Sequence, residues 1–489
     1  MKFTRSISTF LALLLLAGSL AACSTPDDSP NTPTATTSAL IETEDETAIR
    51  DNLPDGLDYG GETITFYQYT DGAPFIVSEL NSDPINDSVF ERNKYVENRL
   101  NVRLSCIEES NGDAYFVVNK TVTAVQSGST DYDVITSPCW VVLDQSHSGT
   151  FANMASAGHI ELEQPWWTQG FNEAISFQGN QYVLAGSILL SIYRNTFATV
   201  FNKTLFTNAN QTFPYEYVQN GTWTLDKQIS LIPLFHRDNG NGTQDELGDY
   251  YGLATGPVIS IDPYWASCEI DILKKNSDGE YELVFDSGRL YDAAEKVLQL
   301  YYETDDSTYV GTAPTVFSNG YAAMATLQVL ALESPEMRSM TDAYGVVPMP
   351  RMTEEQDGYY SLLHDGFTVL AAPTTVTGAQ LDRVGTVLEA MGSASYRIVR
   401  PAYYETTLRT KLVSDPQSSD MMDLIMENMR IDAGYVYVDA LDNFHHGFRE
   451  IIAGRVNTAT SIYKSKQTAT ETMVKQFNAK LTRLINNNK

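Results

Sequence analysis

The hydrophobic pattern of this chain predicts an α/β fold built on parallel sheets. Segments with period-two alternation, typical of strands, are separated by segments with apolar residues at helical spacing. A strand-helix-strand-helix-strand order implies a parallel sheet with right-handed crossovers. In addition, 43% of the 489 residues are hydrophobic and 11% are aromatic. The chain can therefore bury a large core, and its length suits roughly two to three domains.

The first five elements are expected between residues 62 and 136. Strands are predicted at residues 62–67, 102–107 and 132–136, and a helix at residues 114–126. Another helix should open at Ser88, because Ser88 and Glu91 have the spacing of a capping box. Ligands of parallel sheets lie beyond the carboxyl ends of the strands, so the loops after Tyr67 and Thr136 are the first candidates for a site. These loops carry Asp71, Trp140 and Asp144.

A second α/β region follows, and the last third of the chain is mostly helical. Strands are predicted at residues 196–201 and 281–285, and helices at 224–234, 291–302, 420–431, 440–453 and 468–485. The most apolar later stretch, residues 321–332, is shorter than the about 20 residues of a membrane span and indicates a buried core element. The sequence Val347-Pro348-Met349-Pro350 indicates a connector, because neither proline fits inside a helix or a central strand.

The N-terminus has the pattern of an export signal. Lys2 and Arg5 precede an apolar run at residues 10–17, and Leu20-Ala21-Ala22-Cys23 resembles the lipobox of bacterial lipoproteins. We expect a signal peptide at residues 1–22 and lipidation at Cys23; an ordinary signal peptide cut elsewhere is the alternative. Residues 23–57 are rich in Ser, Thr, Pro and acidic residues, which predicts a flexible linker. The mature protein would then be anchored by lipid on the extracellular face of the cytoplasmic membrane.

Composition excludes several classes of function. The net charge of −30 argues against nucleic acid as a partner, because polyphosphate binding needs a surplus of cations. The sequence has no His-Glu-x-x-His, Gly-x-Ser-x-Gly, phosphate-loop or Cys-x-x-Cys motif, so metal hydrolases, serine hydrolases and nucleotide enzymes are not indicated. Once Cys23 is lipidated, Cys106, Cys139 and Cys268 remain, and we expect these thiols to be reduced and mostly buried.

One acidic loop, residues 238–249, has the composition of a calcium loop. With Asp238 at position one, Glu246 and Asp249 occupy positions nine and twelve, whereas Gly240 and Gly242 leave positions three and five without side-chain oxygen. A solvated turn is the favoured interpretation, and calcium at these three residues is the alternative. No other cofactor is expected.

The aromatic content favours a sugar ligand. The chain has 28 Tyr, 20 Phe and 5 Trp residues, and aromatic faces with a polar edge suit the C–H faces and hydroxyls of sugar rings. Most of these aromatics should lie in the core. Trp140 is the strongest candidate for a ligand contact, because it lies in a loop at a strand end.

Seven short motifs together give the chain a recognisable pattern. It resembles the extracellular solute-binding lipoproteins of bacterial ABC importers, in the maltose-binding-like family 1 branch and a subgroup common in Gram-positive anaerobes. The resemblance covers residues 57–489, and each motif is weak alone. They are Asp58-Tyr59-Gly60-Gly61, Tyr132-Asp133-Val134-Ile135, Pro165-Trp166-Trp167, Val200-Phe201-Asn202-Lys203-Thr204-Leu205, Gly221-Thr222-Trp223-Thr224-Leu225-Asp226, Tyr344-Gly345-Val346-Val347-Pro348-Met349-Pro350 and Pro401-Ala402-Tyr403-Tyr404-Glu405-Thr406-Thr407-Leu408.

The resemblance implies a two-lobed, periplasmic-binding-protein-like (type II) fold. Each lobe would be a mostly parallel sheet flanked by helices, and the cleft between them would close on a ligand by a hinge motion. The expected crossings are near residues 196–202, 344–350 and 378–403. The first lobe would hold residues 58–195 and 346–385, and the second lobe residues 196–345 and 386–489.

The resemblance also implies a function without catalysis. The protein would be a monomeric receptor that captures a carbohydrate, such as an oligosaccharide, and delivers it to the transmembrane permease subunits of an ABC importer. Other interpretations are a surface lipoprotein for sensing or partner binding, and a glycoside-active enzyme with two carboxylates, although with 62 acidic residues such a pair is not specific. The residues expected to line the ligand are Asp71, Trp140 and Asp144 in the first lobe, and Trp265, Tyr403 and Phe444 on the second-lobe and hinge side.

Overall fold

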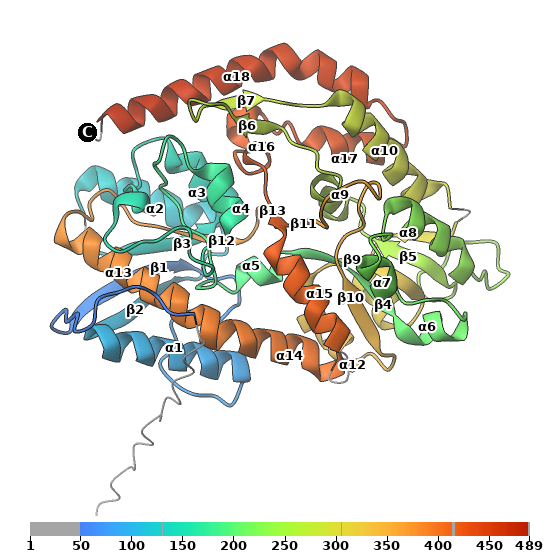
Figure 1. The fold of residues 1–489 in the computed structure, drawn as a ribbon, viewed down its shortest axis with the longest axis horizontal. Coiled ribbons are helices and arrows are strands. Elements are labelled where there is room, and N and C mark those ends of the chain that lie inside the picture. Colours follow the sequence, from blue (N-terminus) through green and yellow to red (C-terminus); the bar gives the residue numbers. More distant parts are fainter. Residues whose placement is uncertain (1–48, 130, 305, 413–415, 488–489) are drawn as a thin grey trace, which may run out of the picture. The chain divides into compact units, whose positions relative to one another are not determined.

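Two β-sheets, each flanked by helices, organise the part of the chain that the structure describes (Figure 1). The computed structural model describes residues 49–129, 131–304, 306–412 and 416–487. The predicted signal peptide, Cys23 and most of the predicted linker lie outside these residues. We call the two sheets and their helices the first and the second lobe.

The first lobe has a four-stranded sheet in the order β12-β3-β1-β2. Strands β1 (Glu62–Tyr69), β2 (Val102–Glu109) and β3 (Val134–Pro138) are parallel, and β12 (Thr368–Ala371) runs antiparallel to β3. The predicted order of five elements is confirmed, with helices α1 (Pro84–Leu100) and α2 (Ala114–Ser127) as the crossovers. Short helices α3 (Cys139–Ser146), α4 (Gln169–Ile175) and α5 (Ser191–Arg194), and the turn η1 (Met154–Ser156), follow β3.

The predicted start of the first helix at Ser88 is wrong. Helix α1 begins at Pro84, and the side chain of Asp83 caps it by accepting hydrogen bonds from the amides of Ile85 and Asn86 at 3.0 and 2.9 Å. Asp is as good a cap as Ser, and Pro is favoured in the first helical turn. The Ser88 hydroxyl instead lies inside the helix and donates to the carbonyl of Ile85 at 2.7 Å.

The second lobe has a five-stranded sheet in the order β10-β4-β9-β5-β8. Strand β5 (Tyr251–Thr255) is parallel to β8 (Thr308–Val310) and β9 (Ala322–Gln328), whereas β4 (Phe197–Asn202) is antiparallel to β9 and β10 (Tyr344–Val347), so this sheet is mixed. Its helices and turns are α6 (Lys203–Asn208), α7 (Pro214–Gln219), α8 (Leu225–Leu231), η2 (Ile232–Phe235), η3 (Ile259–Ile261), α9 (Asp262–Ser267), α10 (Ser287–Tyr302), α11 (Ala313–Ser318), η4 (Val329–Glu333) and α12 (Pro335–Ser339).

Two short strand pairs lie outside the main sheets. Strands β6 (Leu273–Lys275) and β7 (Tyr281–Leu283) form an antiparallel hairpin, so the strand predicted at residues 281–285 exists but belongs to neither lobe's sheet. Strands β11 (Ser361–Leu362) and β13 (Met429–Arg430) pair in parallel and join segments distant in sequence.

The C-terminal third is largely helical, as predicted. It contains α13 (Ala379–Ala394), a π-helical turn η5 (Ser395–Val399), α14 (Arg400–Leu412), α15 (Pro416–Glu427), α16 (Ala433–Val436), η6 (Asp439–Leu441), α17 (His446–Ala453) and α18 (Ala459–Asn487). The single helix predicted at residues 440–453 is wrong. Asp442 and Asn443 both have positive φ, 50° and 55°, and two left-handed residues in succession separate η6 from α17.

The chain passes between the two sheets along three segments of the described residues. The first crossing lies between α5 and β4, the second between β10 and β12, and the third along α13, η5 and α14, which run nearly end to end in Figure 1. The predicted lobe boundary at residues 385/386 falls inside α13. Val387, Leu388 and Met391 of this helix join the first-lobe core, so the boundary lies nearer to η5.

The long helix α18 packs on α10 and on the β6-β7 hairpin, and in Figure 1 it crosses above both. Asn478 on this helix satisfies both backbone groups of Tyr281, accepting from its amide at 3.0 Å and donating to its carbonyl at 2.8 Å. The ring of Phe477 contacts His147 of the first lobe at 5.8 Å between centroids. Helix α18 therefore ties the first-lobe segment after α3 to the second lobe.

Among the described residues, no helix combines the length and apolar character that a membrane crossing requires. Cys106, Cys139 and Cys268 are free thiols, and the last two are buried, as expected.

A buried carboxyl group holds the two consecutive tryptophans of the first lobe. Glu389, on α13 and 1% exposed, accepts hydrogen bonds from the indole nitrogens of Trp166 at 3.1 Å and Trp167 at 2.9 Å. The backbone amide of Glu161 adds a third donor at 3.3 Å. Burial nevertheless raises the pKa of the Glu389 carboxyl to about 8, because charge is costly in this apolar surrounding.

The raised pKa of Glu389 makes stability depend on pH. Between pH 4.5 and about 8 the native state retains the Glu389 proton and the unfolded chain does not, so the free energy of unfolding falls as pH rises through this range. We expect a contribution on the order of 2 kcal/mol, lost between pH 5 and pH 8. Calorimetry at pH 5 and pH 8 should show that the free energy of unfolding falls less in Glu389→Gln than in the unaltered protein, because the Gln side chain does not titrate. Equal falls in both proteins would contradict this assignment.

Candidate functional site

Three of the predicted ligand residues, Asp71, Trp140 and Asp144, lie along one edge of the first-lobe sheet. The carboxyl ends of β1 and β3 meet the start of the antiparallel strand β12 at this edge. Two contacts tie the three ends together: the Thr368 hydroxyl donates to the Asp71 carboxylate at 3.4 Å, and the Cys139 amide donates to the Phe367 carbonyl at 2.8 Å. We call this the first-lobe edge; its members are Asp71, Trp140, Asp144 and Asp365.

Asp71 connects the first-lobe edge to the second lobe. Its carboxylate accepts from the amide of Ala73 at 2.9 Å, and its backbone carbonyl accepts from the Arg194 guanidinium at 3.3 Å. Burial raises the pKa of the Asp71 carboxyl, although Arg194 and the hydrogen bonds oppose the rise. Arg194 also pairs with Glu333 of η4 at 3.2 Å. One chain of polar contacts therefore runs from the end of β1 to the segment after β9.

Tyr403 belongs to the same chain of contacts. It is 1% exposed, and its hydroxyl donates to Glu333 at 2.7 Å. Its ring stacks on Tyr193, with centroids 5.6 Å apart. The predicted residue thus acts at the hinge, by holding Glu333 and packing on the first crossing, and presents almost no surface to a ligand.

Trp140 offers an aromatic surface at the first-lobe edge. It lies in the first turn of α3, is half-buried, and packs edge to face against Tyr115 of α2, with ring centroids 5.1 Å apart. Tyr115 remains 41% exposed. The two rings stand nearly perpendicular, at 86°, and so form an aromatic corner in which both rings keep exposed surface. Sequence reasoning missed Tyr115, which opens a helix and has no neighbouring motif.

Asp144 lies one helical turn after Trp140 and meets a carboxyl group from the C-terminal region. A hydrogen bond links the Asp144 side chain to Asp439 of η6. Burial, followed by this hydrogen bond and the charge of Asp439, raises the pKa of Asp144 to about 8. One carboxyl of the pair therefore keeps a proton at neutral pH and donates it to the other. The pair brings the loop after α16 against the aromatic corner.

A second polar group lies beside the edge, where the segment before β12 meets α9, α16 and α17. The Arg449 guanidinium holds both carboxylate oxygens of Asp262, and the Tyr435 hydroxyl donates to Asp262 at 3.0 Å. Asp365 contacts His364 at 3.2 Å, and burial raises the pKa of its carboxyl. These residues carried no sequence signal, because their partners are about 85 to 190 positions apart and form no motif.

Two predicted ligand residues lie in the core of the second lobe. Trp265 is 3% exposed and packs on Phe448 with ring centroids 5.6 Å apart. Phe444 is 2% exposed and packs on Tyr463 at 4.7 Å and Phe285 at 5.5 Å. Both side chains therefore present almost no surface to a ligand. The structure thus places Asp71, Trp140 and Asp144 at the ends of β1 and β3, links Tyr403 to Asp71 through Glu333 and Arg194, and buries Trp265 and Phe444 among other aromatic side chains.

The loop proposed as an alternative calcium site uses its carboxylates for its own turns. Asp238 accepts from the amide of Gly240 at 2.7 Å, and Asp249 accepts from the amides of Asn239 and Asp245 at 2.9 and 3.0 Å. These backbone hydrogen bonds lower the pKa of Asp249. Glu246 instead accepts from the hydroxyl of Thr312. In the described part of the chain, no three acidic, histidine or cysteine side chains converge as a metal site would require.

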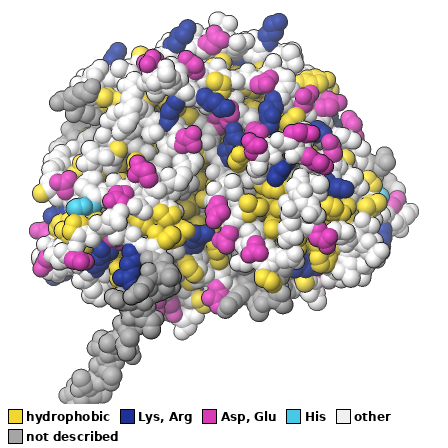
Figure 2. Space-filling view, in the orientation of Figure 1, with side chains coloured by type: hydrophobic (Ala, Val, Ile, Leu, Met, Phe, Trp, Pro, Cys, Tyr) yellow, Lys and Arg dark blue, Asp and Glu magenta, His cyan; other side chains and the backbone are white. Residues whose placement is uncertain are grey.

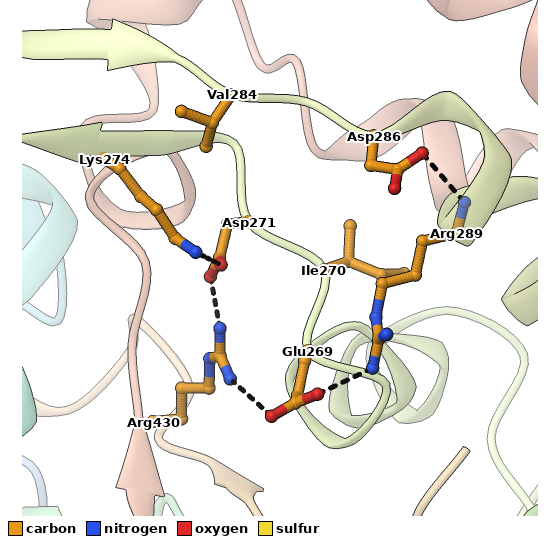
Figure 3. A pocket seen from close by; sticks show the side chains of 8 residues that line it. All are labelled: Glu269, Ile270, Asp271, Lys274, Val284, Asp286, Arg289 and Arg430. Carbon is orange, nitrogen blue, oxygen red and sulfur yellow. Dashed lines mark hydrogen bonds and ion pairs between the residues drawn. The ribbon is translucent and has the colours of Figure 1, made fainter. Parts of the chain in front are cut away.

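A surface pocket of the second lobe, with a volume of about 430 Å³, carries an alternating row of charges (Figure 3). Arg430 of β13 pairs with Asp271, and with Glu269 at 3.9 Å. Lys274 pairs with the same Asp271 at 2.8 Å, and Arg289 with Glu269 at 2.7 Å. Because every charge in this row already has a partner, the network fixes β13 to the loop between α9 and β6 rather than presenting a free charge.

The ion-pair row should contribute to stability through its central residue. Arg430 is 22% exposed, pairs with two carboxylates and lies over the Tyr360 ring at 5.0 Å. We expect Arg430→Ala to lower the free energy of unfolding by about 1–2 kcal/mol. Lys274, 63% exposed and with a single partner, is the matched control, and its replacement by Ala should cost about 0.5 kcal/mol or less. Urea unfolding measures both values; equal losses would refute the central role of Arg430.

No protein-family profile matches the chain, and neither does any curated protein sequence. Solved structures do match. The cyclic α-maltosyl-1,6-maltose binding protein of Arthrobacter globiformis aligns with a TM-score of 0.57 at 14% identity, covering 85% of this chain and 100% of that chain.

Two further structures agree. An ABC substrate-binding protein from Listeria monocytogenes in complex with cycloalternan aligns with a TM-score of 0.53 at 13% identity, covering 84% of this chain and 99% of that one. UgpB from Mycobacterium tuberculosis in complex with glycerophosphocholine aligns with a TM-score of 0.51 at 14% identity, covering 85% and 99%. Likeness at such low identity defines architecture, and this chain therefore has the two-lobed α/β fold of the solute-binding proteins of ABC transporters.

Proposed function

We propose that this chain is the solute-binding receptor of an ABC importer and that its solute is a carbohydrate, namely an oligosaccharide. The observation that carries the proposal is the first-lobe edge, where the aromatic corner of Trp140 and Tyr115 adjoins the carboxyl groups of Asp71, Asp144 and Asp365. Aromatic faces stack on the C–H faces of sugar rings, and carboxylates accept hydrogen bonds from sugar hydroxyls.

The charged groups at the first-lobe edge favour a neutral solute over an anionic one. Structures with this fold include proteins described with cyclic saccharides and one with a glycerophosphodiester. At the first-lobe edge, carboxyl groups outnumber cations, and the nearby Arg449 already holds Asp262. A phosphate would meet unfavourable charge here, whereas a neutral polyhydroxyl solute would find acceptors.

Binding without turnover is the function favoured by the acid pair beside the aromatic corner. Glycoside hydrolysis needs two carboxyls about 5–10 Å apart, one on each side of the scissile bond. Asp144 and Asp439 instead hydrogen-bond to each other and leave no room for a sugar linkage between them. The structures with this fold named above are likewise described as binding proteins.

We also propose a lipid anchor at the membrane and a permease as the partner of this receptor. A lipid on Cys23 and a linker over residues 23–57 would hold the receptor at the extracellular face of the cytoplasmic membrane, close to the permease that receives the solute. Solute binding between the lobes would shift them toward a closed arrangement, and the permease would recognise that arrangement. The N-terminal sequence, with its basic residues, apolar run and lipobox-like end, supports this arrangement.

Trp140 provides the first test of the site. Titration calorimetry against mono- and oligosaccharides should find a saturable ligand, and Trp140→Ala should weaken its binding by about 1–3 kcal/mol, because stacking area is lost. Tyr291→Ala is the control, since Tyr291 is an exposed aromatic on α10, 41% exposed and away from the edge. No saccharide binding would contradict the proposed solute, and normal binding by Trp140→Ala would remove this residue from the site.

Membrane attachment has a separate test. In an expressing bacterium the full chain should fractionate with membranes, whereas Cys23→Ser should be released or retain its signal peptide without lipid, because the acylated thiol is missing. Radiolabelled fatty acid should enter the unaltered protein and not the variant. Labelling of the Cys23→Ser protein would show that the anchor lies elsewhere.

A further inference from the structure

Helix α18 carries a charge opposite in sign to that of the whole chain. Its 29 residues include five cations and one acid, Glu471, which gives the helix a net charge of +4. The whole chain has 32 Lys and Arg residues against 62 Asp and Glu residues, a net charge of −30. In Figure 2, Lys and Arg side chains project along the upper rim of the molecule, where Figure 1 shows α18. The proposed function makes no use of this segregation of charge.

Four of the five cations lie on the solvent-facing side of α18. The opposite side packs on the protein and buries Val474, Phe477 and Leu481. Lys466 is half-buried, whereas the other four cations are exposed, and the exposed positions between them are Ser, Thr, Ala and Gln. This side of the helix therefore presents positive charge and no negative charge. We call the four exposed cations the α18 basic face; they are Lys464, Lys475, Lys480 and Arg483.

The α18 basic face is not neutralised by the protein itself. None of its four cations forms an ion pair with a described residue. Glu280 lines the same shallow pocket as Lys475 and Arg483 without pairing with either, and the Glu471 carboxylate accepts a hydrogen bond from Gln467 at 3.0 Å. The helix dipole does not explain the cations, because the last turn of α18 contains none. The charge of this face therefore remains available to a partner.

The shape and chemistry of the α18 basic face suit an extended anionic surface. Lys464 and Arg483 are 19 positions apart, which corresponds to about 28 Å along the helix axis and exceeds the length of a small ligand. Specific protein interfaces have an apolar core, whereas α18 has no large exposed apolar side chain. The phosphate groups of a bilayer form an extended anionic surface, and the lipid proposed at Cys23 would keep such a surface within reach.

We propose that the α18 basic face docks on the anionic phospholipid headgroups of the bilayer to which the protein is anchored. Each cation near such a surface strengthens binding roughly fivefold, and the negative charge of the rest of the protein is screened beyond about 8 Å at physiological salt. The 26 residues from Cys23 to Ala48 could span up to about 85 Å, which leaves α18 able to reach the surface. The choice of a bilayer rests on the proposed membrane attachment, and the solute plays no part in it.

Lysine footprinting on the unaltered full chain tests the contact directly. An acetylating reagent modifies exposed lysines, and mass spectrometry measures the rate at each one. Phosphatidylglycerol vesicles should slow the acetylation of Lys475 and Lys480 severalfold and leave Lys94 of α1 and Lys120 of α2 unchanged, although these are also exposed. Phosphatidylcholine vesicles, which have no net charge, should protect none of the four. Unchanged rates at Lys475 and Lys480, or equal protection of Lys94, would overturn the bilayer as the partner and leave an acidic protein as the complementary surface.

A matched pair of variants then locates the contact. Both are made in the Cys23→Ser chain, so that no lipid holds the protein on the vesicles, and both lower the net charge by four. The first replaces each cation of the α18 basic face by Gln; the second replaces four exposed cations of other elements by Gln, namely Lys94, Arg103, Lys120 and Lys274.

Vesicle flotation measures the preference of each variant for phosphatidylglycerol over phosphatidylcholine, a ratio in which apolar binding by residues 1–22 cancels. This preference should fall about a hundredfold or more in the first variant and less than tenfold in the second, because only the first removes cations that lie at the headgroups. Equal losses in the two variants, or no loss in the first, would refute α18 as the docking surface.

The docking surface and the proposed solute can fail separately. Protection of Lys475 and Lys480 should disappear at about 1 M salt, because attraction between charges is then screened; protection that persists would overturn an electrostatic contact. A chain that binds a saccharide and shows no protection of α18 would keep its solute and lose the docking surface. Protection of α18 in a chain that binds no saccharide would give the opposite result.

Discussion

The pairing of β12 with β3 is the constraint on which the rest of this structure depends. Residues 368–371 return to complete a sheet that begins at Glu62, and they pair with residues 135–138 in the antiparallel direction. The strands of the second-lobe sheet thus lie between the third and fourth strands of the first in the sequence, and the chain must cross between the lobes more than once. The return also places Asp365 and Thr368 beside Asp71 and Trp140, which builds the first-lobe edge from three separate stretches of sequence.

The first-lobe edge combines exposed aromatic rings with partly buried carboxyl groups, two features that rarely occur together on a protein surface. Trp140 and Tyr115 keep apolar surface open to solvent, and burial raises the pKa of the Asp71, Asp144 and Asp365 carboxyls. A site of this kind costs stability in the free protein. The cost falls when a solute covers the rings and donates hydrogen bonds to the carboxyl oxygens, which is the behaviour expected of a receptor.

Local patterns in the sequence predicted much of the fold and only part of the site. Alternation found β1 and β2, a short apolar run found β3, and β4 was also predicted, because these strands pack apolar side chains into a core. Helical patterns failed at helix ends. Asp83 rather than Ser88 is the cap of α1, and Asp442 and Asn443 interrupt the helix predicted at residues 440–453. Strand-end reasoning found Trp140, but the aromatic character of Trp265 and Phe444 did not distinguish core from surface. Asp262, Asp365 and Arg449 meet only in three dimensions, so no local pattern could indicate them.

The shared carboxyl of Glu389 limits how this protein can change in evolution. Trp166 and Trp167 each donate to one of its two oxygens, so replacing one indole leaves a buried acceptor half satisfied while the other indole still requires it. The effects of single replacements at these three positions are therefore not independent, and an acceptable route must alter the glutamate and both tryptophans in concert. A change at any one of these positions therefore costs stability through the other two, whatever solute the protein binds.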